Sequence, residues 1–227
     1  KSDSVSKIHY ICRTLETELM PNTCFISFRS QFFKYGCFSW HQILMWNPDF
    51  GENNITRWIR KGLLVRLRRG WFAFPEYLQT PDFAMYIAGR IYKPSYISLF
   101  SALSYYGMIP EAVTDITSIT TLKTSSFLNN FGQFSYSSVK TSMFFGFNLK
   151  PTSDGRTITM ATAEKALIDL LYLYPIYSSE DDMRELRLDE AFMQDEFNHG
   201  LADSYIKTIG SKTLHDKMQT LYNAYGI

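Results

Sequence analysis

Six basic residues lie within residues 53–74, a stretch that contains no acidic residue. Guanidinium and ammonium groups at this density neutralise the phosphates of a nucleic-acid backbone. Arginine can also form two hydrogen bonds with the edge of a guanine base in the major groove. The segment therefore predicts nucleic-acid binding. Its basic residues are Arg57, Arg60, Lys61, Arg66, Arg68 and Arg69.

A second polar group consists of Glu164, Lys165 and Asp169, with Asp154 upstream. Two carboxylates near a lysine can bind Mg²⁺ and activate a water molecule, as in nucleases. On a helix, however, Glu164 and Asp169 point in different directions, and Lys165 is expected to pair with Asp169 one turn later. The spacing favours a structural or interaction role. A metal-dependent nuclease that is targeted by the basic segment stays open as the alternative.

Other catalytic or metal-binding motifs are not apparent in the sequence. The histidines lack metal-ligand spacing, and the cysteines are odd in number and widely separated. The sequence contains no phosphate loop, no dinucleotide fingerprint and no nucleophile elbow. We therefore expect no metal, no cofactor and no enzymatic activity, and reduced cysteines in a cytoplasmic protein. The residues concerned are His9, His41, His199 and His215, and Cys12, Cys24 and Cys37.

The basic residues require elements that present them together, and the surrounding pattern predicts a winged helix-turn-helix. Ser39 is expected to cap the second helix, Asn53 or Asn54 the third, and Gly62 to end the third helix. Alternation of apolar residues predicts two antiparallel strands joined by the turn Arg68-Arg69-Gly70. The expected helices are residues 26–36, 40–46 and about 53–61, and the strands are residues 63–67 and 71–74.

The third helix should bury one face and present the other to DNA. Ile55, Trp58 and Ile59 share the face that is expected to be buried. Arg57 and Arg60 are the best candidates to enter the major groove, and the basic turn should reach phosphates or the minor groove. The full set of predicted DNA contacts is Ser39, His41, Asn54, Thr56, Arg57, Arg60, Lys61, Arg66, Arg68 and Arg69.

Charge and composition divide the chain into two parts. Residues 1–79 contain 11 Lys/Arg and 6 Asp/Glu, whereas residues 80–227 contain 12 and 16. This asymmetry predicts an N-terminal DNA-binding domain, residues 1–78, and a C-terminal domain, residues 79–227, with different partners. We expect an amphipathic helix at residues 4–19 and no membrane-spanning segment.

The C-terminal part alternates between helical and strand-like segments, which predicts an α+β fold with a small, mostly antiparallel sheet flanked by helices. Thr80 and Pro81 have the residue types of a helix start. An acidic helical tail follows from residue 181. The expected helices are residues 80–92, 95–106 and 161–173, and the expected strands are residues 114–122, 132–139, 143–148 and 156–160.

Three segments make the chain similar to a known family. They are GLLVRLRRGWFAF at residues 62–74, YISLFSALSYYGMIPE at residues 96–111 and ITMATAEKALIDLLYL at residues 158–173. In this order they resemble the AbiEi family, the antitoxins of type IV toxin–antitoxin systems, which act in abortive infection. The resemblance covers about residues 30–175 and does not extend to the acidic tail.

This resemblance implies a transcriptional autorepressor whose N-terminal domain binds double-stranded operator DNA, with a homodimer on the DNA as one arrangement. It also implies that the C-terminal domain neutralises a cognate nucleotidyltransferase-like toxin. The antagonism in such systems is thought to act on the toxin's effect rather than through a stable complex. Glu164 and Lys165, which match the family's Ala-Thr-x-Glu-Lys-Ala-Leu-x-Asp stretch, are the residues that the resemblance assigns to antitoxin function.

Overall fold

The computed structural model describes residues 24–227, so the amphipathic helix predicted at residues 4–19 lies outside the described part. The chain divides into two compact units, of which the first ends at Gln79 and the second is Thr80–Ile227. The boundary predicted from charge and composition, after residue 78, lies next to this division. We describe each unit by itself.

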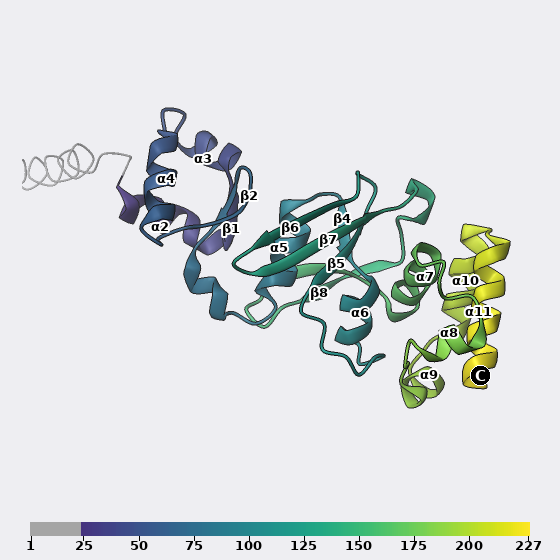
Figure 1. Ribbon diagram of the computed structural model, residues 1–227. Coiled ribbons are helices and arrows are strands. Elements are labelled where there is room, and N and C mark those ends of the chain that lie inside the picture. Colours follow the sequence, from purple (N-terminus) through teal and green to yellow (C-terminus); the bar gives the residue numbers. More distant parts are fainter. Residues whose placement is uncertain (1–23) are drawn as a thin grey trace, which may run out of the picture. The chain divides into compact units, whose positions relative to one another are not determined.

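The N-terminal unit combines helices with a small antiparallel sheet (Figure 1). Its strands lie in the order β1-β3-β2, so that the last strand in sequence occupies the centre. In chain order, the elements are α2 (Phe25–Phe32), the 3-10 turn Phe33–Tyr35, β1 (Cys37–Ser39), α3 (Trp40–Trp46), α4 (Glu52–Arg60), β2 (Val65–Arg68), β3 (Trp71–Ala73) and the 3-10 turn Pro75–Gln79.

Aromatic side chains form the core of this unit. Phe28 of α2 is fully buried, and its ring centroid lies 4.8 Å from that of Trp58 on α4 and 5.4 Å from that of Phe38 on β1. Phe50, in the loop before α4, also packs on Trp58 at 5.7 Å. These large rings bury much apolar surface in specific geometry, so they fix α4 against α2 and the sheet.

The ends of α3 and α4 confirm part of the predicted capping. Ser39 caps α3 in a capping box with Gln42, as its residue type predicts. The cap predicted for α4 at Asn53 or Asn54 is wrong, because the helix already begins at Glu52 and Gly51 is the N-cap residue. At the other end, Gly62 has a φ of 69°, and Leu63 N–H donates to the carbonyl of Trp58, which makes a Schellman motif.

The C-terminal unit is built on a six-stranded sheet in the order β6-β7-β5-β4-β9-β8. The β5–β7 and β4–β9 pairings are parallel and the other three are antiparallel, so the sheet is mixed, with an antiparallel majority. The strands are β4 (Ser95–Ile97), β5 (Ile116–Thr120), β6 (Ser125–Asn129), β7 (Gly132–Ser138), β8 (Phe147–Pro151) and β9 (Thr157–Ala161).

Helices cover this sheet and extend beyond it. Helix α5 packs on β4, β5 and β9, whereas α6 packs on β5 and α7, and α7 continues the contacts to α10 and α11 (Figure 1). The helices are α5 (Phe83–Ile91), α6 (Leu99–Tyr105), α7 (Ala163–Leu173), α8 (Glu180–Arg184), α9 (Glu190–Asp195), α10 (His199–Ile209) and α11 (Lys212–Tyr225), with a 3-10 turn at Thr141–Met143. The α+β class predicted from the sequence is confirmed. Each helix within residues 24–227 is too short or too polar to cross a lipid bilayer.

Several predicted elements are wrong in type or position. The helix expected at residues 95–106 is divided into β4 and α6, because β4 pairs with β5 on one side and β9 on the other. The strand expected at residues 143–148 begins only at Phe147. Helix α5 begins at Phe83, after an N-cap residue, Asp82, with a φ of 59°, rather than at Thr80. Strands β1 and β6 had no sequence signal strong enough to predict them.

Candidate nucleic-acid interface

The exposed face of α4 gathers the residues expected to meet DNA. Asn53, Thr56, Arg57, Arg60 and Lys61 surround a shallow cavity of about 480 Å³. Their spacing of three and four residues places them on one side of the helix. The opposite side holds the buried Ile55 and Trp58, so burial of the apolar residues forces the basic ones outward.

Arg57 is oriented by its own helix. Its Nη2 donates a hydrogen bond of 2.8 Å to the Oδ1 of Asn54, one turn earlier. Asn54, itself a predicted DNA contact, thus also orients Arg57. Within residues 24–227, Arg57, Arg60 and Lys61 form no salt bridge with a carboxylate, so their charges are available to an external anion.

The β2–β3 hairpin presents the second set of cations. Val65 and Leu67 of β2 are buried, and Arg66, which alternates with them, is exposed. The register shifts between Arg66 and Arg68, and the chain reverses at Arg69 and Gly70. Gly70 has a φ of 76°, a conformation that glycine adopts without strain and that allows this tight turn.

The start of α3 adjoins the hairpin turn. Trp40 N–H donates a 2.8 Å hydrogen bond to the carbonyl of Gly70, and Ser39 is paired with Trp71 across the sheet. The structure therefore brings the predicted contacts Ser39 and His41 next to the basic turn. His41 is exposed, whereas the Oγ of Ser39 accepts a hydrogen bond from Gln42 N–H and is used in capping.

Arg29 shows that not every basic residue of this unit is available. Its Nη2 forms a 3.0 Å salt bridge with Glu76, and its guanidinium lies 4.0 Å from the ring centroid of Phe33. By contrast, Arg66 and Arg69 of the hairpin, like the three cations of α4, form no salt bridge within residues 24–227.

In the C-terminal unit, the second predicted polar group forms a buried network. Lys165 and Asp169 of α7 form a salt bridge, as their spacing predicts, and both side chains are fully buried. Tyr96 donates a 2.9 Å hydrogen bond to Asp169 and accepts one of 2.9 Å from Lys165. Ser98 donates a further bond of 2.8 Å to Asp169. The network thus ties β4 to α7.

Burial controls the titration of this network. It lowers the pKa of Lys165 and raises the pKa of Asp169, while their mutual attraction opposes both shifts. The pKa of Tyr96 is raised by burial and then by the charge of Asp169. Perturbed groups of this kind also occur in active sites, but here they are closed off from solvent and satisfied by one another.

Glu164 has a different partner. Its Oε1 accepts a 3.0 Å hydrogen bond from the backbone N–H of Asn198, the N-cap residue of α10, and its side chain is buried. Glu164 and Asp169 therefore point to different neighbours, as their spacing predicts. Within residues 24–227 no group of three or more histidine, cysteine or acidic side chains is arranged to hold a metal ion.

Glu164 and Lys165, the candidates for antitoxin function that the resemblance implies, are both buried. At 6% and 0% exposure, neither side chain is accessible to a partner molecule in this structure. The sequence analysis does not identify Tyr96 and Ser98 as partners of the Lys165–Asp169 pair, because it predicts one helix over residues 95–106. Residues two positions apart in an extended segment lie on the same side of it. An extended segment at residues 95–98 would therefore have placed Tyr96 and Ser98 side by side.

Comparison with known proteins finds no family model and no curated sequence that matches this chain.

Proposed function

We propose that the N-terminal unit is a winged helix-turn-helix and that the protein is a sequence-specific DNA-binding repressor. One observation carries this proposal: within residues 24–227, Arg57, Arg60 and Lys61 at α4 and Arg66 and Arg69 of the hairpin form no salt bridge with a carboxylate. The order α2-β1-α3-α4-β2-β3, with β3 central in the sheet, supports the assignment of α4 as the recognition helix and of the hairpin as the wing.

In this proposal, the two basic elements have different tasks. Arg57, held by Asn54, and Arg60 read base edges in the major groove, where arginine pairs with guanine. Arg66, Arg68 and Arg69 of the hairpin, with His41 nearby, contact the backbone and set the register. Neutralisation of phosphates supplies most of the affinity, and the α4 contacts supply the preference for one sequence.

We further propose that the protein is the antitoxin of a type IV toxin–antitoxin system, opposing a nucleotidyltransferase-like toxin. The support is the resemblance of residues 96–111 and 158–173 to the AbiEi family. These segments include β4 and β9, which pair in parallel, and the network of Tyr96, Ser98, Lys165 and Asp169 joins them. The resembling residues therefore hold the C-terminal unit together, and its exposed surface is left to provide the antagonism.

Binding to the DNA upstream of its own gene tests the repressor. We expect saturable binding whose log affinity falls against log salt concentration with a slope of about −4 to −5, for about five phosphate contacts. Fluorescence anisotropy with the upstream duplex and a scrambled duplex of equal length measures both affinity and preference. A slope near zero, or equal affinity for both duplexes, would contradict sequence-specific binding. For the antitoxin, a nucleotidyltransferase-like gene should lie next to this one, and co-expression of the two should restore the growth that the toxin gene alone inhibits.

A further inference from the structure

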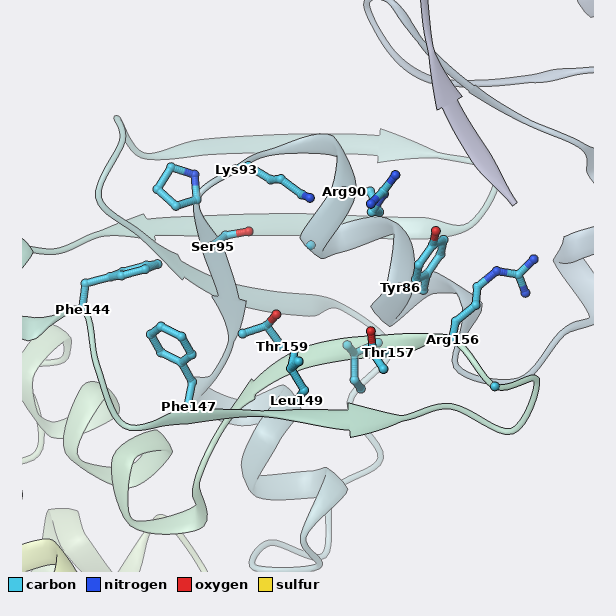
Figure 2. A pocket seen from close by; sticks show the side chains of 14 residues that line it. Tyr86, Arg90, Lys93, Ser95, Phe144, Phe147, Leu149, Arg156, Thr157 and Thr159 are labelled. Atoms are coloured by element: carbon cyan, nitrogen blue, oxygen red, sulfur yellow. The ribbon is translucent and has the colours of Figure 1, made fainter. Parts of the chain in front are cut away.

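The C-terminal unit contains a cavity that the proposed DNA-binding function does not use. It lies between α5 and the strands β4, β8 and β9, and has a volume of about 580 Å³ (Figure 2). Cavities of this size commonly hold a small-molecule ligand. Basic side chains line one part of the cavity and aromatic side chains line another. This arrangement indicates which chemical groups a ligand should carry.

One part of the cavity is cationic. Arg90, near the end of α5, and Lys93, just after it, reach the cavity from one wall, and Arg156 reaches it from the loop before β9 (Figure 2). Arg156 forms an ion pair with Asp154, so part of its charge is already compensated. Arg90 forms no salt bridge with any carboxylate of residues 24–227.

Arg90 also has an unsatisfied donor. Its Nε is buried and has no hydrogen-bond partner within the described residues, although its guanidinium lies 5.8 Å from the ring centroid of Tyr86. Buried donors in folded proteins are nearly always paired, and an unpaired one calls for an explanation. Because no carboxylate compensates this guanidinium, an anionic group in the adjoining cavity would be the counter-charge that the described residues do not supply.

The other part of the cavity is aromatic. Phe144 and Phe147 lie in edge-to-face contact, with ring centroids 5.2 Å apart, and Phe147 stacks on the buried Tyr96 at 4.7 Å (Figure 2). Tyr96 belongs to the buried network, so the rings rest on a fixed support. Phe144 and Phe147 are only partly buried, and each leaves ring surface on which a planar group can stack.

Hydroxyl groups lie between these two parts. Thr157 and Thr159 are two residues apart on β9 and share one side of the strand, and Ser95 of β4 lies beside them (Figure 2). The Oγ of Ser95 donates to the carbonyl of Tyr92 and keeps its lone pairs as acceptors. Together these groups can exchange hydrogen bonds with a polyhydroxylated unit such as a sugar.

We propose that this cavity binds a nucleoside phosphate. The cations, above all the guanidinium of Arg90, would hold the phosphate, the hydroxyl groups would form hydrogen bonds with the ribose, and Phe144 and Phe147 would stack on the base. This chemistry is shared by free nucleotides and by the 5′-phosphorylated end of a single-stranded nucleic acid. The site is separate from α4 and the hairpin, and does not depend on the proposed DNA-binding function.

The test measures binding to the full chain carrying Arg68→Ala and Arg69→Ala, which weaken the other cationic surface. The probes are ATP, GTP, inorganic triphosphate and a short 5′-phosphorylated single-stranded oligonucleotide, titrated by calorimetry. We expect saturable binding of at least one nucleoside phosphate, weakened about tenfold or more by Arg90→Gln. Tighter binding of a mononucleotide assigns the site to free nucleotides, and tighter binding of the oligonucleotide assigns it to a nucleic-acid end.

Matched variants separate the parts of the site. Phe144→Ala should weaken the binding of nucleotides and leave the binding of inorganic triphosphate unchanged, because only the nucleotide has a base that can stack. Arg184→Gln removes a guanidinium from α8, outside the cavity, and should have no effect. Lys93→Gln provides a second test of the cationic part if Arg90→Gln alters the thermal unfolding curve. Absence of saturable binding up to about 1 mM of every probe, or binding that both Arg90→Gln and Lys93→Gln leave intact, would overturn the proposal.

Discussion

At the scale of single residues, Lys165 and Asp169 form a fully buried ion pair. Moving two charges out of water is costly, and the mutual attraction compensates only when further hydrogen bonds satisfy both groups. Here the hydroxyls of Tyr96 and Ser98 provide those bonds. The pair therefore has a structural role, because its hydrogen bonds join β4 to α7. Its contribution to stability depends on all four side chains being present.

Lys165→Met should destabilise the protein strongly, because it leaves the carboxylate of Asp169 buried without its counter-charge. We expect the free energy of unfolding to fall by about 3–5 kcal/mol. The double variant Lys165→Met, Asp169→Leu should recover much of this loss, since no charge remains to be desolvated. Urea denaturation followed by circular dichroism measures both. A single variant within about 1 kcal/mol of the wild type would contradict the role assigned to the pair.

Gly146 supports Lys165 by leaving space for it. A Cβ at this position would lie 2.9 Å from the Cγ of Lys165, and the φ of 74° is also unfavourable for other residues. Gly155 has a similar φ of 81°, but a Cβ there would meet no atom within 4 Å. Both substitutions by alanine should lower the free energy of unfolding because of the unfavourable φ. Gly146→Ala should lower it by about 1–3 kcal/mol more, because its Cβ overlaps the side chain of Lys165. Equal losses in urea denaturation would contradict this explanation.

At the scale of elements, α4 and the β2–β3 hairpin are expected to make separable contributions to DNA binding. Base contacts specify the sequence, whereas phosphate contacts are independent of it. The structure supports this division, because α4 presents a single exposed polar face and the hairpin presents its arginines at a turn. Arginine-to-alanine substitutions in each element can therefore show which element determines sequence preference and which determines overall affinity.

Arg60→Ala should lower affinity for the upstream duplex by about 1–3 kcal/mol and reduce the preference over a scrambled duplex. Arg69→Ala should lower the affinity for both duplexes equally, and should reduce the magnitude of the slope of log affinity against log salt concentration by about 1. Arg29→Ala, which removes a guanidinium already paired with Glu76, serves as the control and should change little. The division of tasks would be wrong if Arg69→Ala altered preference and Arg60→Ala did not.

Helix α8 is stabilised by a titratable cap. Asp182 accepts hydrogen bonds from the side chain and backbone of Ser179, which lower its pKa from 3.8 to about 2. A pKa that is lower in the folded state contributes stability above the unfolded value, and this contribution is lost as pH falls through about 2. Asp182→Asn should therefore reduce the loss of stability between pH 4 and pH 2. The exposed Asp195→Asn is the control, and identical pH profiles for the wild type and Asp182→Asn would refute the cap's role.

At the scale of the whole molecule, the two compact units differ in charge and in core. Residues 1–79 have an excess of basic residues, and residues 80–227 have an excess of acidic ones. The first unit is organised around the aromatic cluster at Phe28, the second around a sheet and the buried Lys165–Asp169 pair. Each unit has its own core, so each is expected to fold and to bind its own ligand separately.

Cutting the chain after Gln79 should separate the two activities. We expect the fragment of residues 1–79 to bind the upstream duplex with the salt slope of the full chain, because it contains all the predicted phosphate contacts. The fragment of residues 80–227 should unfold cooperatively in urea and should not bind duplex DNA. Anisotropy and circular dichroism of the two fragments test this. Duplex binding that requires both fragments together would show that the C-terminal unit contributes to the interface.

The sequence by itself determined the features that depend on neighbours along the chain. The cap at Ser39, the end of α4 at Gly62, the basic face of α4 and the pairing of Lys165 with Asp169 all follow from spacings of a few residues, where helix geometry fixes which side chains meet. The mixed α+β class and the change of character near residue 79 follow in the same way from composition and periodicity.

Only the tertiary structure decided what depends on distant partners. Residues 95–97 form a strand because β5 and β9 lie on either side of them, and no local signal indicates this. Tyr96 and Ser98 join the network of Lys165 and Asp169, and Glu164 reaches Asn198, across separations that periodicity cannot predict. The cavity next to Arg90 likewise exists only after α5 has packed on the sheet, because its walls come from three separate stretches of the chain, within residues 86–95, 144–149 and 155–159.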